Sequence, residues 1–380
     1  GGTTMSAIAR NIDMSVRKGV TTRPGGMAVM SALLAFALMI AGCISDPAIT
    51  SPPVVNAGAH GVLVVNEGVW KQDNSTLTFY NPDSGGPVQD YFTARNPGLR
   101  LGDLGNSIVA WNGRGYIAVS TSRAVEVIDL ATGHSLGRVR LSAPNEPRMI
   151  TVIDSATAFV TTFADSVIRF NPITLAATGA FPVGPAPEGI AYAAGHLFVA
   201  NSGLGNLRRA EPKAGTISVL DPASGADLMT LPVGTNPLSV HYLPSRNRVY
   251  VLARPILPDT LGAVVEYDPL LLREVRRWVV AGGYDMAVDD ARGIIHVMRA
   301  DGVARIDPSV ATDGVSDLVR LSDAGRMFYS IGVEPVSGDL YLGTTKGYSS
   351  VPAEVMIFDR AGIVKSRFAC GIYPGDFAFY

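Results

Sequence analysis

From residue 60 onward, short segments with alternating apolar and polar positions recur along the chain. Seven of them end in an Asp or Asn, usually followed by Pro or small residues, at positions 81, 129, 171, 221, 268, 307 and 359. Such a side chain accepts hydrogen bonds from the backbone N–H groups of a turn, while Pro and Gly supply the backbone angles that a turn needs. We therefore interpret the seven residues as structural. Their spacing of 39 to 52 residues predicts a repeat architecture.

Each repeat contains further strand-like segments. An apolar segment precedes each of the seven, as in GVLVVNEG from Gly61 and GHLFVANS from Gly195. A third segment, led by a turn, precedes six of these, as in APEGIAYA from Ala186, but the first repeat lacks one. The missing copy stands at the other end of the sequence, where YPGDFAFY from Tyr373 has the same turn and the same alternation.

This arrangement predicts an all-β fold, a seven-bladed β-propeller over residues 60–380. The ring is closed by pairing of the C-terminal strand with the first blade, which explains why residues 377–380 are apolar. Because no single blade can bury both of its faces, we expect one domain.

The first 42 residues resemble a secretion signal. Residues 27–40 are 14 apolar or small residues, which is short of the roughly 20 that a membrane span needs but suits a signal-peptide core. Arg17, Lys18 and Arg23 precede this core. We expect the protein to start at Met14, with residues 1–13 not native and a lipoprotein signal peptide over residues 14–42.

Residues 40–43, Ile-Ala-Gly-Cys, resemble the lipobox of bacterial lipoproteins. The resemblance implies that Cys43 is lipidated and that the chain is attached to a membrane only through this lipid anchor. Ile44, where an Asp would favour the inner membrane, favours the outer membrane, on its surface or its periplasmic side. Residues 43–59 contain three Pro and no regular pattern, which predicts a flexible tether.

The composition excludes some classes of function. The net charge is −2 and charged residues make up 17%, which argues against nucleic-acid binding because that requires a basic face. The chain has two Cys and five scattered His, so we expect neither a disulfide framework, nor a metal site, nor a bound cofactor. Cys370 is predicted to be a small buried apolar side chain.

Several stretches carry a family resemblance that spans nearly the whole predicted propeller. They are VLVVNEGVW with NSTLTFYNP, LGDLGN, VEVIDLATG, APEGIAYAAGHLFVANSG and GIYPGDFAF. With these the sequence resembles the YncE-like, YVTN-type β-propellers. It resembles more closely a family of outer-membrane propeller lipoproteins that includes the BtuG-type proteins. The resemblance implies capture of vitamin B12 (cobalamin) or another corrinoid and its transfer to a TonB-dependent outer-membrane transporter.

Two sets of loops in a propeller share one face, namely those entering the innermost strands and those between the second and third strands. Ligands usually bind over such loops. Aromatic, Arg and carboxylate or amide side chains in these loops suit a large, flat and partly polar ligand. The predicted ligand-binding residues are Glu67, Trp70, Arg148, Glu188, Asn201, Arg254, Tyr284 and Tyr329.

For a corrinoid, Trp70, Tyr284 and Tyr329 would pack on the ring or the tail base. Arg148 and Arg254 would bind amide oxygens or phosphate, whereas Glu188 and Asn201 would accept or pair with amide N–H groups.

Two other classes of function stay open. The propeller could be a protein-docking accessory of a transporter without a ligand of its own. It could also be a metal-dependent lactonase-type or lyase-type enzyme, with Glu67, Asn106, Glu188 and Asn201 as oxygen ligands of Ca²⁺. Because no His lies in the expected loops to act as acid or base, we expect that the protein is not an enzyme.

Overall fold

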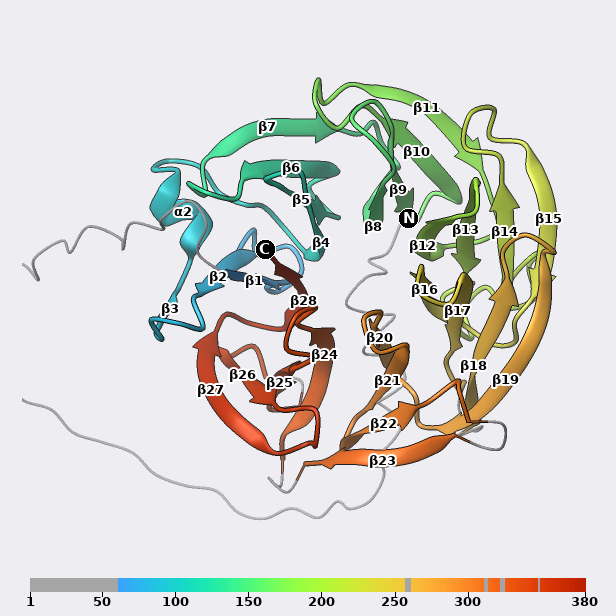
Figure 1. Cartoon of the computed structure of the whole chain (residues 1–380). Helices are drawn as coiled ribbons and strands as arrows, with labels where there is room; N and C mark the ends of the chain where they lie inside the picture. The colour runs from blue at the N-terminus through green and yellow to red at the C-terminus, as the bar shows by residue number, and fades with distance from the viewer. Residues whose placement is uncertain (1–60, 257–260, 311–313, 322–324, 348) are drawn as a thin grey trace, which may run out of the picture.

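A computed structural model describes residues 61–256, 261–310, 314–321, 325–347 and 349–380. The predicted signal peptide, the lipidation site at Cys43 and the tether lie outside these ranges. Within them, seven four-stranded antiparallel sheets are arranged in a ring, which confirms the predicted propeller (Figure 1). No helix in the described ranges is long and apolar enough to cross a membrane.

The first blade takes its inner strand from the end of the chain. It consists, from the axis outward, of β28 (Pro374–Phe379), β1 (Val62–Asn66), β2 (Thr76–Tyr80) and β3 (Pro87–Val88). Helix α2 (Tyr91–Arg95) connects it to the second blade. The next two blades are β4 (Gly105–Trp111), β5 (Arg114–Val119), β6 (Ala124–Asp129) and β7 (Ser135–Arg140), then β8 (Pro147–Val152), β9 (Ala158–Thr162), β10 (Ser166–Phe170) and β11 (Ala177–Pro182).

The remaining four blades follow the same order from the axis outward. The fourth and fifth are β12 (Pro187–Ala193), β13 (His196–Asn201), β14 (Thr216–Leu220) and β15 (Asp227–Pro232), then β16 (Pro237–Leu243), β17 (Arg248–Ala253), β18 (Leu261–Asp268) and β19 (Arg273–Ala281). The last two are β20 (Asp285–Asp289), β21 (Ile294–Arg299), β22 (Gly302–Ile306) and β23 (Val315–Arg320), then β24 (Met327–Val333), β25 (Leu340–Thr345), β26 (Ala353–Phe358) and β27 (Val364–Cys370).

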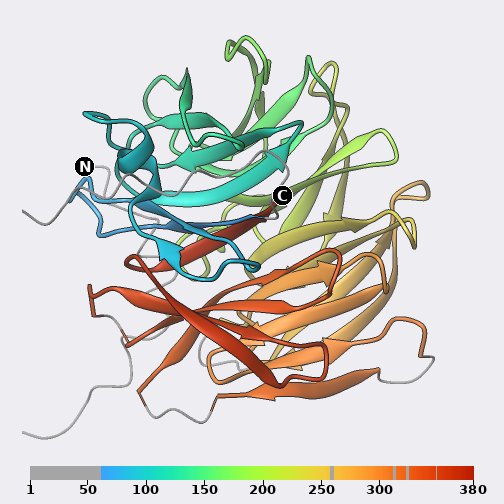
Figure 2. The same ribbon diagram turned by 60° about the vertical axis from the view of Figure 1, so that its left-hand side comes forward.

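Ring closure follows the prediction. Strand β28 pairs with β1 through Phe377 opposite Val64 and Phe379 opposite Val62. Gly61 and Tyr380 exchange two backbone hydrogen bonds of 2.8 and 3.1 Å beyond this register. In the view of Figure 2 the C-terminal strand lies within the blade built by the first strands. The apolar end of the chain is therefore a paired strand.

The core is divided among the contacts between neighbouring blades. Seven clusters of buried apolar side chains each join residues of two adjacent blades. The cluster between the seventh and first blades contains Val64, Phe377 and Cys370, which is 1% exposed. Burial also raises the pKa of the Cys370 thiol, in agreement with the predicted buried apolar role. Each blade thus depends on both of its neighbours.

The seven predicted turn residues have the expected structural role. Their side-chain oxygens accept backbone N–H groups two to four residues further on, as Asn171 does from Ile173 and Thr174 at 2.9 and 2.7 Å. Equivalent bonds occur at the other six positions. The prediction of turn chemistry at these positions is confirmed.

Candidate functional site

The two ends of the propeller carry different loops. We call the end at which the inner strands begin the loop face; it also carries the turns between second and third strands. The opposite end, with the turns between first and second and between third and fourth strands, is the turn face. All eight predicted ligand-binding residues lie at the loop face, at the starts of inner strands or the ends of second strands. Their placement agrees with the sequence, while ligand binding stays a prediction.

Arg148 and Glu188 form a buried ion pair between the third and fourth blades. Both side chains are 1% exposed, and Nε and Nη2 of Arg148 each lie 2.9 Å from Oε2 of Glu188. Arg148 also donates through Nη1 to Oδ1 of Asn106, on the second blade. Its guanidinium carbon lies 4.7 Å from the centre of the half-buried Phe163 ring. This network joins three consecutive blades.

Glu67 and Tyr329 meet across the closure of the ring. The Tyr329 hydroxyl donates to Oε2 of Glu67 at 2.8 Å, and the Tyr329 ring packs against Tyr373 with 5.5 Å between centroids. A Cβ on Gly375 would lie 2.9 Å from Cγ of Glu67, so the absence of a side chain at position 375 leaves the space that Glu67 occupies. Tyr373 itself is only half-buried.

Arg254 and Tyr284 connect the fifth and sixth blades. The guanidinium carbon of Arg254 lies 3.8 Å from the centre of the Tyr284 ring, a close cation–π contact. Arg254 is 2% exposed, whereas Tyr284 is half-buried. The buried cation therefore fixes one face of a ring that remains open to solvent on part of its surface.

Asn201 stabilises the fourth blade through buried hydrogen bonds. Its side chain is fully buried, donates to the hydroxyls of Thr216 and Ser218 at 3.0 Å each and accepts from the Gly184 N–H at 3.0 Å. Asn66 holds the first blade in the same way through Thr76 and Thr78. These contacts occupy the groups that a ligand would need.

Trp70 lies in the turn after β1 and is half-buried. The Lys71 ammonium lies 4.1 Å from its ring centre, and the Lys71 N–H donates to both carboxylate oxygens of Asp103 at 2.9 and 3.1 Å. Burial raises the pKa of Asp103, although the Lys71 N–H acts against this shift. The turn that presents Trp70 is thereby attached to the connection between the first two blades.

The axis of the ring is a channel of about 360 Å³. Its wall is mostly apolar, with His241, Asp285 and Asp376 among its polar side chains. Asp285 accepts from the Ser239 hydroxyl at 2.7 Å, and Asp376 accepts from the Ile108 N–H at 2.9 Å. Burial lowers the pKa of His241, and the nearby Asp285 opposes that change.

None of these channel residues belongs to the predicted set of eight. The signal for them is the period-2 alternation of the inner strands, which places Ser239 and His241 on the same side of β16. Applying that alternation to each inner strand would have identified them.

Each of the four oxygen ligands considered for a Ca²⁺ enzyme has a partner within the protein, and that of Asn106 is Arg148. Glu188 pairs with Arg148, Glu67 accepts from Tyr329, and Asn201 lies within its own blade. Among the described residues no group of three or more His, Cys, Asp and Glu side chains is placed to hold a metal ion.

Comparisons with known proteins support the fold. Residues 60–217 match a family described as a domain of unknown function (DUF5074). No curated protein sequence matches the chain significantly.

Three solved structures illustrate the similarity of fold. A quinonprotein alcohol dehydrogenase-like protein from Bacteroides thetaiotaomicron has a TM-score of 0.65 at 16% identity, over 84% of this chain and 78% of its own. A candidate 6-phosphogluconolactonase from Bacteroides fragilis has a TM-score of 0.63 at 14% identity, over 87% and 100%. Kuenenia stuttgartiensis hydrazine synthase has a TM-score of 0.61 at 17% identity, over 72% and 88%. At these identities the similarity concerns the fold alone.

Proposed function

We propose that the protein is a non-enzymatic binding propeller that captures a flat, partly polar small molecule on its loop face. One observation carries the proposal. Three half-buried aromatic rings, Phe163, Tyr284 and Tyr373, each lie against a buried side chain that fixes them, namely Arg148, Arg254 and Tyr329. Aromatic surfaces held in this way lose little conformational entropy when a ligand packs on them.

A corrinoid, with cobalamin first, is the ligand that we propose. The sequence resemblance supports this choice, and the half-buried rings of the loop face offer the aromatic area that such a ligand needs. The channel of about 360 Å³ is at the small end for a ligand pocket, so a macrocycle would lie over its mouth rather than inside it.

The proposal includes a location and a partner. A lipid on Cys43 would anchor the chain at the outer membrane, and a TonB-dependent transporter would receive the ligand. The geometry is compatible with this arrangement because Gly61, where the preceding segment joins the propeller, pairs with Tyr380 at the turn face. The loop face then points away from the point of attachment and is accessible to ligand.

The test is calorimetric titration of cyanocobalamin into the chain from Ile44 onward. We expect saturable 1:1 binding at micromolar affinity or tighter. We expect Tyr284→Ala to weaken it at least tenfold, because the substitution removes the ring that Arg254 holds at the loop face. Tyr192→Ala is the matched control, since Tyr192 is also half-buried but lies near the end of inner strand β12, toward the turn face.

Absence of both heat and a thermal shift would refute corrinoid capture. The docking-accessory function would then be favoured, and copurification of the transporter with the lipidated chain would test it. A Ca²⁺-dependent thermal shift, reversed by EDTA, would instead favour the metal-dependent enzyme.

A further inference from the structure

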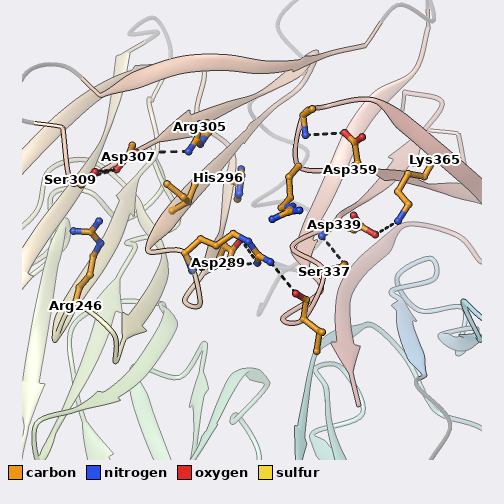
Figure 3. Close-up of a pocket in the computed structure, with 15 residues that line it drawn as sticks. Arg246, Asp289, His296, Arg305, Asp307, Ser309, Ser337, Asp339, Asp359 and Lys365 are labelled. Carbon is orange, nitrogen blue, oxygen red and sulfur yellow. Dashed lines mark hydrogen bonds and ion pairs between the residues drawn. The ribbon is translucent and has the colours of Figure 1, made fainter.

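A large groove lies on the turn face, at the side of the propeller opposite the proposed ligand site. Its volume is about 1070 Å³, and turns of the fifth, sixth and seventh blades line it (Figure 3). Five cationic side chains, Arg246, Arg292, Arg305, Arg360 and Lys365, face four carboxylates in its lining. Which of these charges are already satisfied within the protein decides what the groove can bind.

The four carboxylates all have donors within the protein. Asp289 accepts from Arg292 at 3.0 and 3.1 Å, and Asp339 pairs with Lys365 at 2.5 Å. Asp307 and Asp359 are two of the turn residues and accept backbone N–H groups at 2.9 Å. Two of the five cations are thus held in close ion pairs, and all four carboxylates are occupied.

Three arginines keep donors available to a ligand. Arg246 uses Nε to reach the Gly293 carbonyl at 3.1 Å, and no hydrogen bond from its terminal nitrogens is found among the described residues. Arg305 forms only a long ion pair, with its Nη2 3.9 Å from Oδ2 of Asp307, and this distance is too long for a hydrogen bond. Arg360 is exposed, and within the described part of the chain neither a hydrogen bond nor an ion pair involves its side chain.

A buried histidine on the same wall gives a second, independent indication. His296 lines the groove, is 4% exposed, and its Nδ1 has no hydrogen-bond partner within the described structure. It lies opposite Arg305 in the pairing of β21 with β22. Burial, together with the charge of Arg305, lowers the pKa of His296 to about 4. The imidazole is therefore neutral at pH 7, in positive surroundings, with an unsatisfied polar atom.

We propose that this groove binds a phosphate group, held by Arg246, Arg305 and Arg360 beside His296. Guanidinium groups bind phosphate oxygens through paired N–H donors, and three of them from separate blades surround one anion better than a single contact would. The excess of one positive charge over the carboxylates in the lining suits a singly or doubly charged anion. The volume of the groove, about 1070 Å³, is large enough to admit the organic part of a phosphate ester as well.

Two sources of phosphate share this chemistry, a soluble phosphate ester and a phospholipid headgroup. The groove lies on the turn face, where Gly61 and Tyr380 also lie. If the lipid anchor of the proposed function is present, the groove faces the membrane surface. This second source rests on the proposed function, whereas the phosphate site itself does not.

The experiment uses the chain from Ile44 onward, which retains the complete closed ring. Soluble binding is measured by titration with inorganic phosphate and with glycerol 3-phosphate. Lipid binding is measured by sedimentation with vesicles of phosphatidylcholine, with and without phosphatidylglycerol. The test variant is Arg305→Gln with Arg360→Gln. A variant with Arg209→Gln and Arg320→Gln is the control, because it removes the same charge from two exposed arginines outside the groove.

We expect the test variant to weaken phosphate binding at least tenfold and the control to leave it within twofold. Arg360→Lys, which keeps the charge but removes the planar group, should give an intermediate loss. If the soluble anions bind, a soluble phosphate ester is sufficient as the ligand. If only vesicles that contain phosphatidylglycerol bind, the ligand is the phospholipid headgroup. Both results support the site if the test variant weakens the binding at least tenfold.

The proposal is wrong if neither the anions nor the vesicles bind, or if the test and control variants lose binding equally. Its failure is distinguishable from that of the proposed function. Cyanocobalamin binding should be unchanged in the Arg305 and Arg360 variant, and phosphate binding should be unchanged in Tyr284→Ala.

Discussion

The Arg148–Glu188 pair offers a direct test of what holds neighbouring blades together at the loop face. Both side chains are 1% exposed, and Asn106 satisfies a further donor of the guanidinium. Replacing Arg148 by Met keeps an apolar side chain of similar length but leaves the Glu188 carboxylate buried without its cation. Removing one partner of a buried pair costs about 3–5 kcal/mol, mostly as the penalty for the remaining charge.

The expected shift in melting temperature follows from the size of the propeller. With an unfolding entropy of about 2.1 cal/mol/K per residue over roughly 320 residues, 3–5 kcal/mol corresponds to a decrease of about 4–7 °C. Urea unfolding followed by tryptophan fluorescence should show the same loss as a lower midpoint at an unchanged slope. The Arg148→Met, Glu188→Gln double variant should recover part of this stability, since it removes the stranded charge.

Arg100→Met is the matched control. Arg100 pairs with Asp73 at 3.3 Å, but the two side chains are 69% and 53% exposed. Exposed pairs contribute about 0–1 kcal/mol, so the control should shift the melting temperature by less than 2 °C. A loss below 1 kcal/mol for Arg148→Met, or no recovery in the double variant, would show that the pair does not stabilise the packing of these blades.

Two further predictions concern the end of the chain. Deleting residues 377–380 removes the buried Phe377 ring and the strand pairs of β28 with Val62, Leu63 and Val64. The deletion should therefore destabilise the protein by more than a single buried Phe→Ala change, which costs roughly 3–5 kcal/mol. A truncated chain with the melting temperature of the intact chain would contradict ring closure. Cys370 is buried and the pKa of its thiol is raised, so a thiol reagent at pH 8 should label it only after denaturation, and rapid labelling of the folded protein would show that this blade opens.

The blade structure could be predicted from sequence for three strands in four. Inner, second and third strands are largely buried and show clear alternation, whereas outer strands do not. Strand β15, with the exposed residues Asp227 to Thr230, presents one buried side chain in six. Backbone pairing with β14 sets the position of β15, so its sequence has no alternation of apolar residues from which the strand could be predicted. The fourth strand of each blade was therefore missed.

The candidate site could be located from sequence, but the exposure of its residues could not. Alternation and turn order placed Arg148, Glu188 and Tyr284 at one face correctly. Their exposure depends on contacts between different blades, such as Arg148 with Glu188 and Arg254 with Tyr284. Phe163 and Tyr373 are likewise half-buried rings that lie against buried side chains of other segments. The groove on the turn face was also missed, because two of its carboxylates have the sequence pattern of ordinary turn residues.

The pairing of β28 with β1 also sets the timing of folding during synthesis. About 300 residues separate the two strands, which at roughly 5–20 residues per second is a delay of about 15–60 s. During that interval β1 can pair with β2 on one side but has an open edge on the other, and open edges attract foreign strands. The newly made first blade therefore keeps one unpaired strand edge until β28 has been synthesised.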